Sequence, residues 1–156
     1  MKDFTRIIVM SDSHGRRKLV DEVLQKHPDA DYVFHLGDGA DDIEDAKIEY
    51  PNIKFHQVEG NCDRYTRHSL REHIIIDRKR IIILHGHEQG VKYTLDLLVS
   101  FGHAEDADLV LYGHTHKPEI FCDEGMYIMN PGAMKDGRYG IVDIVNGKLV
   151  LTNARL

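Results

Sequence analysis

The chain has 156 residues, of which 42% are hydrophobic and 29% charged, and its formal net charge is −6. This length suits one domain spanning residues 1–156, and the acidic balance argues against a protein that binds long nucleic acid through a basic face. No apolar run reaches the roughly 20 residues that span a bilayer, and the N-terminus shows no signal peptide. We therefore expect no membrane partner and a cytoplasmic location, which two cysteines without a CxxC pair also favour.

Strand-like and helix-like segments alternate in the first 60 residues. Apolar runs at 7–10, 32–36 and 53–58 indicate buried strands. Between them, residues 18–26 carry apolar side chains at helical spacing, and residues 41–46 place carboxylates where the first turn of a short helix favours them. Three such steps predict a parallel sheet.

Hairpins become frequent after residue 70. The expected elements are strands at 73–76 and 81–84 around a polar turn, a helix at 91–101, a strand at 109–112, and hairpins over 118–129 and 139–153. The second of these hairpins contains Asn146-Gly147, a strong turn signal between alternating strands. Together the segments predict an α/β fold with two mixed sheets packed face to face and helices outside.

Polar side chains follow each core strand up to residue 116. Because ligand sites form at the carboxyl ends of parallel strands, we expect these side chains to converge. They offer two carboxylates, one amide oxygen and four imidazoles, which exceeds the four ligands of a structural zinc and suits two divalent ions that share a carboxylate. The motifs are Asp12-x-His14, Gly37-Asp38, Gly60-Asn61, His85-Gly86 and Gly113-His-x-His116.

These five motifs, in this order, resemble the signature blocks of the calcineurin-like metallophosphoesterases, and the likeness runs from about Ile7 to Met134. The short length, the sequence Gly-Asn-Cys-Asp and the tail Asn130-Pro-Gly132 make the chain most similar to the small microbial phosphodiesterase subgroup. The resemblance implies the metallo-dependent phosphatase fold, a four-layer αββα sandwich of two mixed β-sheets flanked by helices.

The resemblance also implies a role for each motif. The implied metal ligands are Asp12, His14 and His116 for one ion, Asn61, His85 and His114 for the other, and Asp38 as the bridge between both. The histidine before the glycine is the ligand in the family pattern, so His87 has no assigned role.

This arrangement implies hydrolysis of a small phosphodiester. A hydroxide bridging the two ions attacks phosphorus in line, without a covalent enzyme intermediate. Asp38 and Asn61 are the implied catalytic residues, since Asp38 joins the ions and Asn61 neutralises charge on the phosphoryl oxygens. Mixed nitrogen and oxygen ligands without thiolate favour two transition-metal ions, with Mn²⁺ expected and Ni²⁺, Fe²⁺ or Zn²⁺ as alternatives.

One position departs from the family pattern. Cys62 stands where many members carry a histidine, and a thiol is a poor proton donor, so the group that protonates the leaving group stays open. The simpler interpretation of Cys62 is a small buried residue. Asp63 either orients a neighbour, binds Arg64 or is an ordinary turn residue.

Other charged and imidazole side chains also have assigned expectations. Arg16 is the nearest candidate for binding substrate phosphate, with Arg17 beside it, although a solvated position at a helix start accounts for either equally well. His35 is expected to be a hydrogen-bonded core residue. The histidines expected at the surface are His27, His56, His68, His73 and His103.

Two alternative functions remain at this point. A phosphomonoesterase of broad specificity would use the same metal core. A non-catalytic protein-binding scaffold of the same fold predicts missing ligands, and none is missing here. Exposed strand edges leave room for a homodimer or a higher homo-oligomer.

Overall fold

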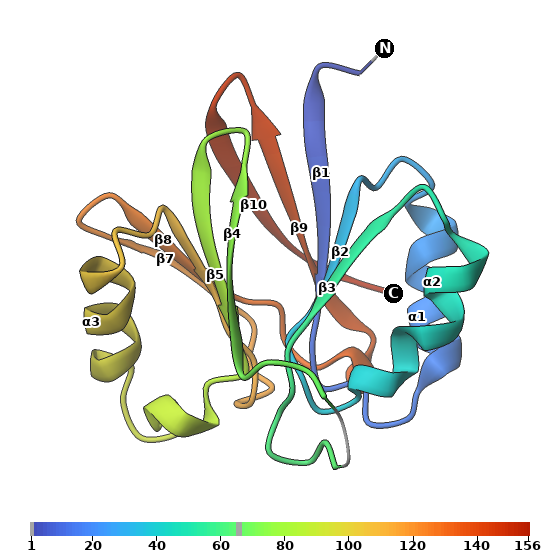
Figure 1. The fold of residues 1–156 in the computed structure, drawn as a ribbon, viewed down its shortest axis with the longest axis horizontal. Helices are drawn as coiled ribbons and strands as arrows, with labels where there is room; N and C mark the ends of the chain where they lie inside the picture. The colour runs from blue at the N-terminus through green and yellow to red at the C-terminus, as the bar shows by residue number, and fades with distance from the viewer. Residues whose placement is uncertain (1, 65–66) are drawn as a thin grey trace.

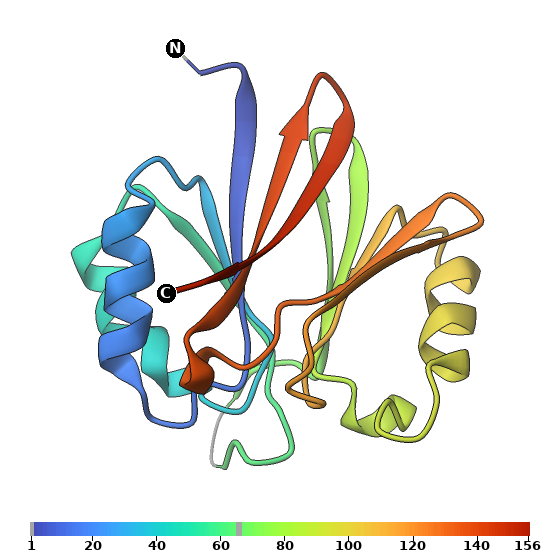
Figure 2. The same cartoon turned by 180° about the vertical axis from the view of Figure 1, so that it is seen from behind.

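Two five-stranded β-sheets lie face to face in the middle of the molecule, with helices on both outer surfaces (Figures 1 and 2). The structure is a computed structural model that describes residues 2–64 and 67–156. The four-layer αββα sandwich expected from the sequence is confirmed. Within the described ranges, no helix is both long enough and apolar enough to cross a membrane.

The first sheet has the strand order β10-β9-β1-β2-β3. Strands β1, β2 and β3 are parallel, whereas β9 runs antiparallel to both β1 and β10. Ile7 fixes the register of the central strand, because it pairs with Tyr32 on one side and Val142 on the other. The strands are β1 (Phe4–Met10), β2 (Tyr32–His35), β3 (Lys54–Gln57), β9 (Arg138–Val145) and β10 (Lys148–Arg155).

The second sheet has the order β4-β5-β6-β8-β7. Its three central strands are parallel, and the antiparallel strands β4 and β7 form the two edges. Both sheets are therefore mixed, as the alternation of βα steps and hairpins predicted. The strands are β4 (Arg71–Ile76), β5 (Lys79–Leu84), β6 (Leu109–Leu111), β7 (Glu119–Asp123) and β8 (Met126–Asn130).

The helices divide between the two outer faces. Helices α1 and α2 flank the first sheet and α3 flanks the second (Figure 1). The α-helices are α1 (Arg17–Lys26), α2 (Glu44–Glu49) and α3 (Asp96–Ala104), and the 3₁₀ turns are η1 (Ala40–Ile43), η2 (His87–Gln89) and η3 (Met134–Asp136).

Helix α3 begins five residues later than the periodicity predicted. Gly90 adopts a left-handed conformation with φ of 62°, and residues 91–95 continue as turns. The Thr94 hydroxyl then accepts the Asp96 N–H at 3.2 Å, which satisfies a free donor at the start of the helix. The apolar spacing of residues 91–95 therefore reflects a packed turn segment and not a helix.

Apolar side chains fill three separate layers. The central layer lies between the two sheets and includes Ile7, Phe34 and Ile83, none of which is exposed. A second layer packs α1 and α2 on the first sheet, and a third packs α3 on the second sheet. Burial on both faces explains why the central strands read as nearly continuous apolar runs.

Candidate metal centre

The loops that follow β1, β2, β3, β5 and β6 meet at one end of the sandwich, the lower end in Figure 1. Hydrogen bonds fasten them together. The His14 N–H donates to the Asp38 carbonyl at 3.1 Å, and His85 Nδ1 donates to the Leu36 carbonyl at 2.8 Å. The second bond joins the two sheets, so the carboxyl ends of both contribute to one site.

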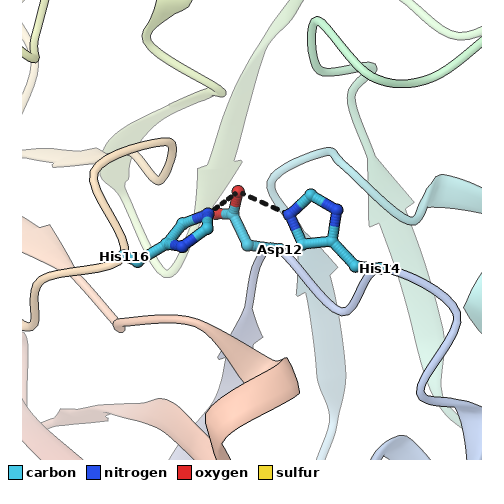
Figure 3. A group of neighbouring side chains, drawn as sticks. All are labelled: Asp12, His14 and His116. Atoms are coloured by element: carbon cyan, nitrogen blue, oxygen red, sulfur yellow. Dashed lines mark hydrogen bonds and ion pairs between the residues drawn. The ribbon is translucent and has the colours of Figure 1, made fainter.

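One group of potential metal ligands consists of Asp12, His14 and His116. His116 Nε2 lies 3.1 Å from Asp12 Oδ1, and His14 Nε2 lies 3.6 Å from the same oxygen. The two imidazoles approach the carboxylate from opposite sides (Figure 3). The other oxygen, Asp12 Oδ2, accepts the Ser11 hydroxyl and the His114 N–H, so that Oδ1 is left to face the imidazoles.

A second group consists of Asp38, His85 and His114. His85 Nε2 lies 3.3 Å from Asp38 Oδ2 and 3.1 Å from His114 Nδ1. Because His85 Nδ1 donates to a carbonyl, Nε2 is the nitrogen that points a proton at Asp38 when the ring is charged and carries the lone pair when the ring is neutral, the form that binds metal. Lone pairs that face one another at these distances repel unless a cation lies between them, so the donor set fits a divalent metal ion.

Asp38 lies between the two groups. Its Oδ2 is 3.3 Å from His85 Nε2 and 3.8 Å from His14 Nε2, whereas its Oδ1 accepts the Cys62 N–H at 2.8 Å. Burial opposes ionisation of this carboxyl, but the hydrogen bond and charge of His85 and the Cys62 N–H outweigh it. The pKa of Asp38 is therefore well below its usual range, and the carboxylate is available to a cation.

The imidazoles of the second group differ in their protonation. Burial lowers the pKa of His85, but the nearby carboxylates of Asp38 and Asp12 outweigh it and raise the pKa. Burial, followed by the charges of His85 and Lys92, lowers the pKa of His114 to about 4. His114 is thus neutral near pH 7, the form in which imidazole binds metal.

The backbone at the centre is unusual, because five non-glycine residues there adopt positive φ. Such conformations are costly and cluster at sites where the surrounding structure imposes them. The angles are 55° at Asp12, 45° at His14, 57° at Asp38, 70° at His114 and 64° at His116.

Two glycines allow the loops to approach the carboxylates. A Cβ at Gly60 would collide with the Asp38 side chain, and a Cβ at Gly113 would collide with Ser11 and lie 2.8 Å from Asp12 Oδ2. The glycines in these motifs therefore leave room for the carboxylates that face the centre.

Asp63 fastens the loops that carry Asp38 and Gly60. Its Oδ2 accepts the Asp38 and Gly60 N–H groups at 2.8 Å each, and its Oδ1 accepts those of Gly39 at 2.8 Å and Ala40 at 3.2 Å. Burial opposes ionisation, but these donors outweigh it and hold the pKa of Asp63 below its usual range. Of the three interpretations of Asp63, the structure supports the orienting role.

A buried relay supports the loop between Asp12 and His14. The Gly37 N–H donates to His35 Nδ1, so His35 Nε2 donates to Ser13 Oγ, and the Ser13 hydroxyl donates to Asp42 Oδ2 at 2.6 Å. Burial lowers the pKa of His35 to about 4. His35 is therefore the neutral, hydrogen-bonded core histidine that the sequence predicted. Asp42 also accepts the Gly15 N–H, a role that sequence reasoning missed.

Asn61 and Arg16 lie at exposed positions beside the two groups. Asn61 Nδ2 is 3.6 Å from Cys62 Sγ. Across residues 2–64 and 67–156, the Arg16 guanidinium has no hydrogen-bond or ion-pair partner, whereas Arg17 lies 3.6 Å from both Asp42 and Asp45. Arg16 is thus the arginine free to contact an anion.

The expected burial of Cys62 is wrong, because this thiol is exposed. The Cys62 N–H is held by Asp38, and this places the residue at the open mouth of the site instead of in the core. Its Sγ lies within 4.8 Å of ligand atoms of His14 and Asp38. Desolvation and the Asp38 charge raise the pKa of this thiol, so it stays protonated near neutral pH.

His87, which had no assigned role, is a neighbour of the second group. Its ring centroid lies 5.5 Å from that of His85 and 6.2 Å from that of His114. Its Nδ1 is buried and has no hydrogen-bond partner within the described part of the chain.

Three of the five histidines expected at the surface are half-buried and paired. His27 contacts the Tyr139 hydroxyl, His56 contacts Glu72, and His68 contacts Gln57. His73 and His103 are exposed, as expected. The partners of the first three come from distant positions along the chain, and local sequence carries no signal for them.

The comparisons with known proteins agree with this geometry. A family model described as a calcineurin-like phosphoesterase superfamily domain matches residues 5–146. The probable metallophosphoesterase YsnB of Bacillus subtilis is 27% identical over 133 residues, which is 83% of this chain and 75% of that protein. The phosphodiesterase MJ0936 of Methanocaldococcus jannaschii is 27% identical over 143 residues, which is 81% of this chain and 82% of that protein.

Solved structures share the fold over nearly the whole chain. A predicted phosphoesterase from Streptococcus pneumoniae superposes with a TM-score of 0.81 at 27% identity, covering 99% of this chain and 91% of the other. Vacuolar Protein Sorting 29 from Cryptosporidium parvum superposes with a TM-score of 0.77 at 16% identity, covering 99% of each chain, and at that identity the likeness concerns the fold alone.

Proposed function

Because the chain belongs to the calcineurin-like phosphoesterase superfamily, we propose that it is a metal-dependent phosphodiesterase that hydrolyses small diesters. The observation that carries the proposal is the position of Asp38 Oδ2 between two groups of ligand atoms, 3.3 Å from His85 and 3.8 Å from His14. A carboxylate oxygen in that position suits a pair of divalent ions better than a single one. The phosphodiesterase MJ0936 among the relatives supports the same reaction class.

In this proposal each side chain of the site has either a metal-binding or a substrate-binding role. Asp12, His14 and His116 would hold one ion, His85 and His114 would hold the other, and Asp38 would serve both. Asn61 would complete the second set, and Mn²⁺ is the expected metal. Such ions supply an activated water and neutralise charge on the phosphoryl oxygens. Asn61 and Arg16, both exposed at the mouth of the site, orient the substrate phosphate through N–H donors.

The choice of a diester rests on charge and access. Two carboxylates and one hydroxide would offset three of the four positive charges of two divalent ions, and the remaining single positive charge matches the single negative charge of a diester. His14, Asn61 and Arg16 are all exposed, so both substituents of a diester have room to leave the phosphate.

A paired-substrate assay tests the proposal. The protein is stripped with a chelator, reloaded with Mn²⁺, and assayed with bis-(p-nitrophenyl) phosphate and with p-nitrophenyl phosphate. We expect kcat/KM for the diester to be the higher of the two, and activity to vanish when the chelator is restored. A higher value for the monoester would assign a phosphomonoesterase. Hydrolysis of neither ester by metal-loaded protein would leave a non-catalytic scaffold.

A further inference from the structure

A groove adjoins the metal centre on the side of the second sheet. It has a volume of about 360 Å³, which lies in the range of small-molecule sites. Its lining comes from the turn segment before α3 and from the loop after β6. The lining residues are Val91, Lys92, Leu95, Tyr112, Thr115, Lys117 and Glu119.

Two short connections place the groove beside the centre. Thr115 lies between His114 and His116 in the chain, and Val91 packs so closely on Gly86 that a Cβ there would lie 2.9 Å from it. Gly86 directly follows His85. The groove therefore borders the segments that carry His85, His114 and His116.

The groove has an apolar wall and a cationic rim. Val91 and Tyr112 are buried residues in the lining, whereas Lys92 and Lys117 are exposed. Neither ammonium group has a hydrogen-bond or ion-pair partner in residues 2–64 and 67–156. The one carboxylate in the lining, that of Glu119, accepts the Tyr112 hydroxyl at 2.6 Å.

We infer that this groove binds the part of the diester that leads away from the scissile phosphorus, and that this part combines a planar ring with a second phosphate. An apolar wall suits a ring, and two unpaired ammonium groups against one engaged carboxylate suit an anion. A short oligonucleotide with a terminal phosphate has both features. The inference rests on the proposed function and names its substrate class.

The reaction on such a substrate balances without any further reactant. Water adds its oxygen to the internal phosphorus, one P–O ester bond breaks, and the departing ester oxygen takes up a proton that comes overall from that water. The products are a phosphomonoester and an alcohol, each on a nucleoside or nucleotide. The terminal phosphate remains unchanged and serves only for binding.

Two dinucleotides test the inference through a specificity ratio. The substrates are thymidylyl-thymidine with and without a 5′-phosphate, and the readout is the ratio of their kcat/KM values. We expect the wild type to prefer the phosphorylated form about tenfold, mainly through KM, since each tenfold step corresponds to about 1.4 kcal/mol. Lys92→Met with Lys117→Met should bring the ratio close to one. Lys148→Met, an exposed lysine in the β9–β10 hairpin, is the matched control and should leave the ratio unchanged.

A binding measurement separates the groove from the chemistry. Metal-free protein is titrated with thymidine 5′-monophosphate while backbone amide chemical shifts are followed. We expect shifts at Val91, Leu95 and Thr115 that the paired lysine variant loses. Those shifts without any diester hydrolysis would refute the proposed function and support the groove. Hydrolysis of bis-(p-nitrophenyl) phosphate with a ratio near one and no such shifts would overturn the groove instead.

Discussion

Asp38 uses its two carboxylate oxygens for different purposes. Oδ1 accepts the Cys62 N–H, and this bond fixes the rotation of the carboxylate. Oδ2 is thereby directed toward His85 and His14. A single side chain thus links the loop after β3 to both ligand groups.

Replacing that carboxylate tests its assigned role. Asp38→Asn retains the shape but loses the charge and one acceptor, so we expect kcat on bis-(p-nitrophenyl) phosphate to fall by roughly a thousandfold, a barrier increase of about 4 kcal/mol. Asp41→Asn, an exposed neighbour in η1, is the control and should remain within about twofold of wild type. Full activity in Asp38→Asn would contradict the role of Asp38 as a ligand shared by two ions.

His35 makes a separate prediction about pH. Its folded-state pKa of about 4 is below the ordinary value of 6.5, so the unfolded chain binds the proton more readily. The stabilisation is complete above pH 6.5 and is lost as pH falls toward 4, by about 3 kcal/mol in all. His35→Gln can still accept from Gly37 and donate to Ser13, so we expect it to lose this part of the pH dependence.

Urea unfolding of metal-free protein at several pH values measures the difference. His73→Gln, at an exposed position, should follow the wild-type curve. Parallel curves for wild type and His35→Gln between pH 6.5 and 4 would show that His35 does not carry the effect.

At the scale of elements, the loops that follow the strands carry the candidate ligands, and the strands fix the positions of these loops. Asp63 joins the loop after β2 to the loop after β3 through four backbone N–H groups. These side-chain hydrogen bonds connect the two segments where no strand pairing does so. The Asp63 carboxylate accepts all four backbone N–H groups, which would otherwise have no hydrogen-bond acceptor.

Removing the Asp63 carboxylate should therefore weaken the attachment between the loops that carry Asp38 and Gly60. We expect Asp63→Ala to lower the free energy of unfolding by about 2–4 kcal/mol, because several backbone donors lose their acceptor together. Metal affinity, measured by calorimetric titration with Mn²⁺, should weaken as well. Asp136→Ala, an exposed residue of η3, is the control. An unchanged unfolding curve for Asp63→Ala would mean that solvent replaces the carboxylate at no cost.

The sequence predicted the strands from local patterns, and it placed the candidate ligands at the strand ends, whereas their division between two ions was implied only by the family resemblance. Apolar runs mark buried strands, and the residues at their ends are adjacent in the chain to the runs that position them. Asp42, Asp63 and the paired histidines act on distant segments, so their roles depend on which loops meet. The same reason explains Cys62, whose exposure depends on the packing of a loop and not on its own residue type.

For the molecule as a whole, metal binding and stability are linked. Asp12 and His14 follow β1 of the first sheet, whereas His116 follows β6 of the second. The other group likewise combines Asp38 from the first sheet with His85 and His114 from the second. Each ion would therefore hold the two sheets together.

Thermal unfolding tests this link. We expect saturating Mn²⁺ to raise Tm by roughly 10–20 °C, given about 2–3 kcal/mol for each of the two sites filled well above its Kd. His116→Ala should lose a large part of the rise, and His73→Ala, at an exposed position and in none of the potential ligand groups of the described residues, should keep all of it. A rise of equal size in both variants would place the stabilising ion elsewhere.

The shared origin of the ligands has a consequence for ion choice. The two halves of each ligand group lie on loops that follow strands of different sheets, so their separation depends on how the two sheets pack against each other. Leu36 and Leu111 are buried in the apolar layer between the sheets. We therefore expect substitutions that change the volume of this layer to alter which ionic radius the two ligand groups accept.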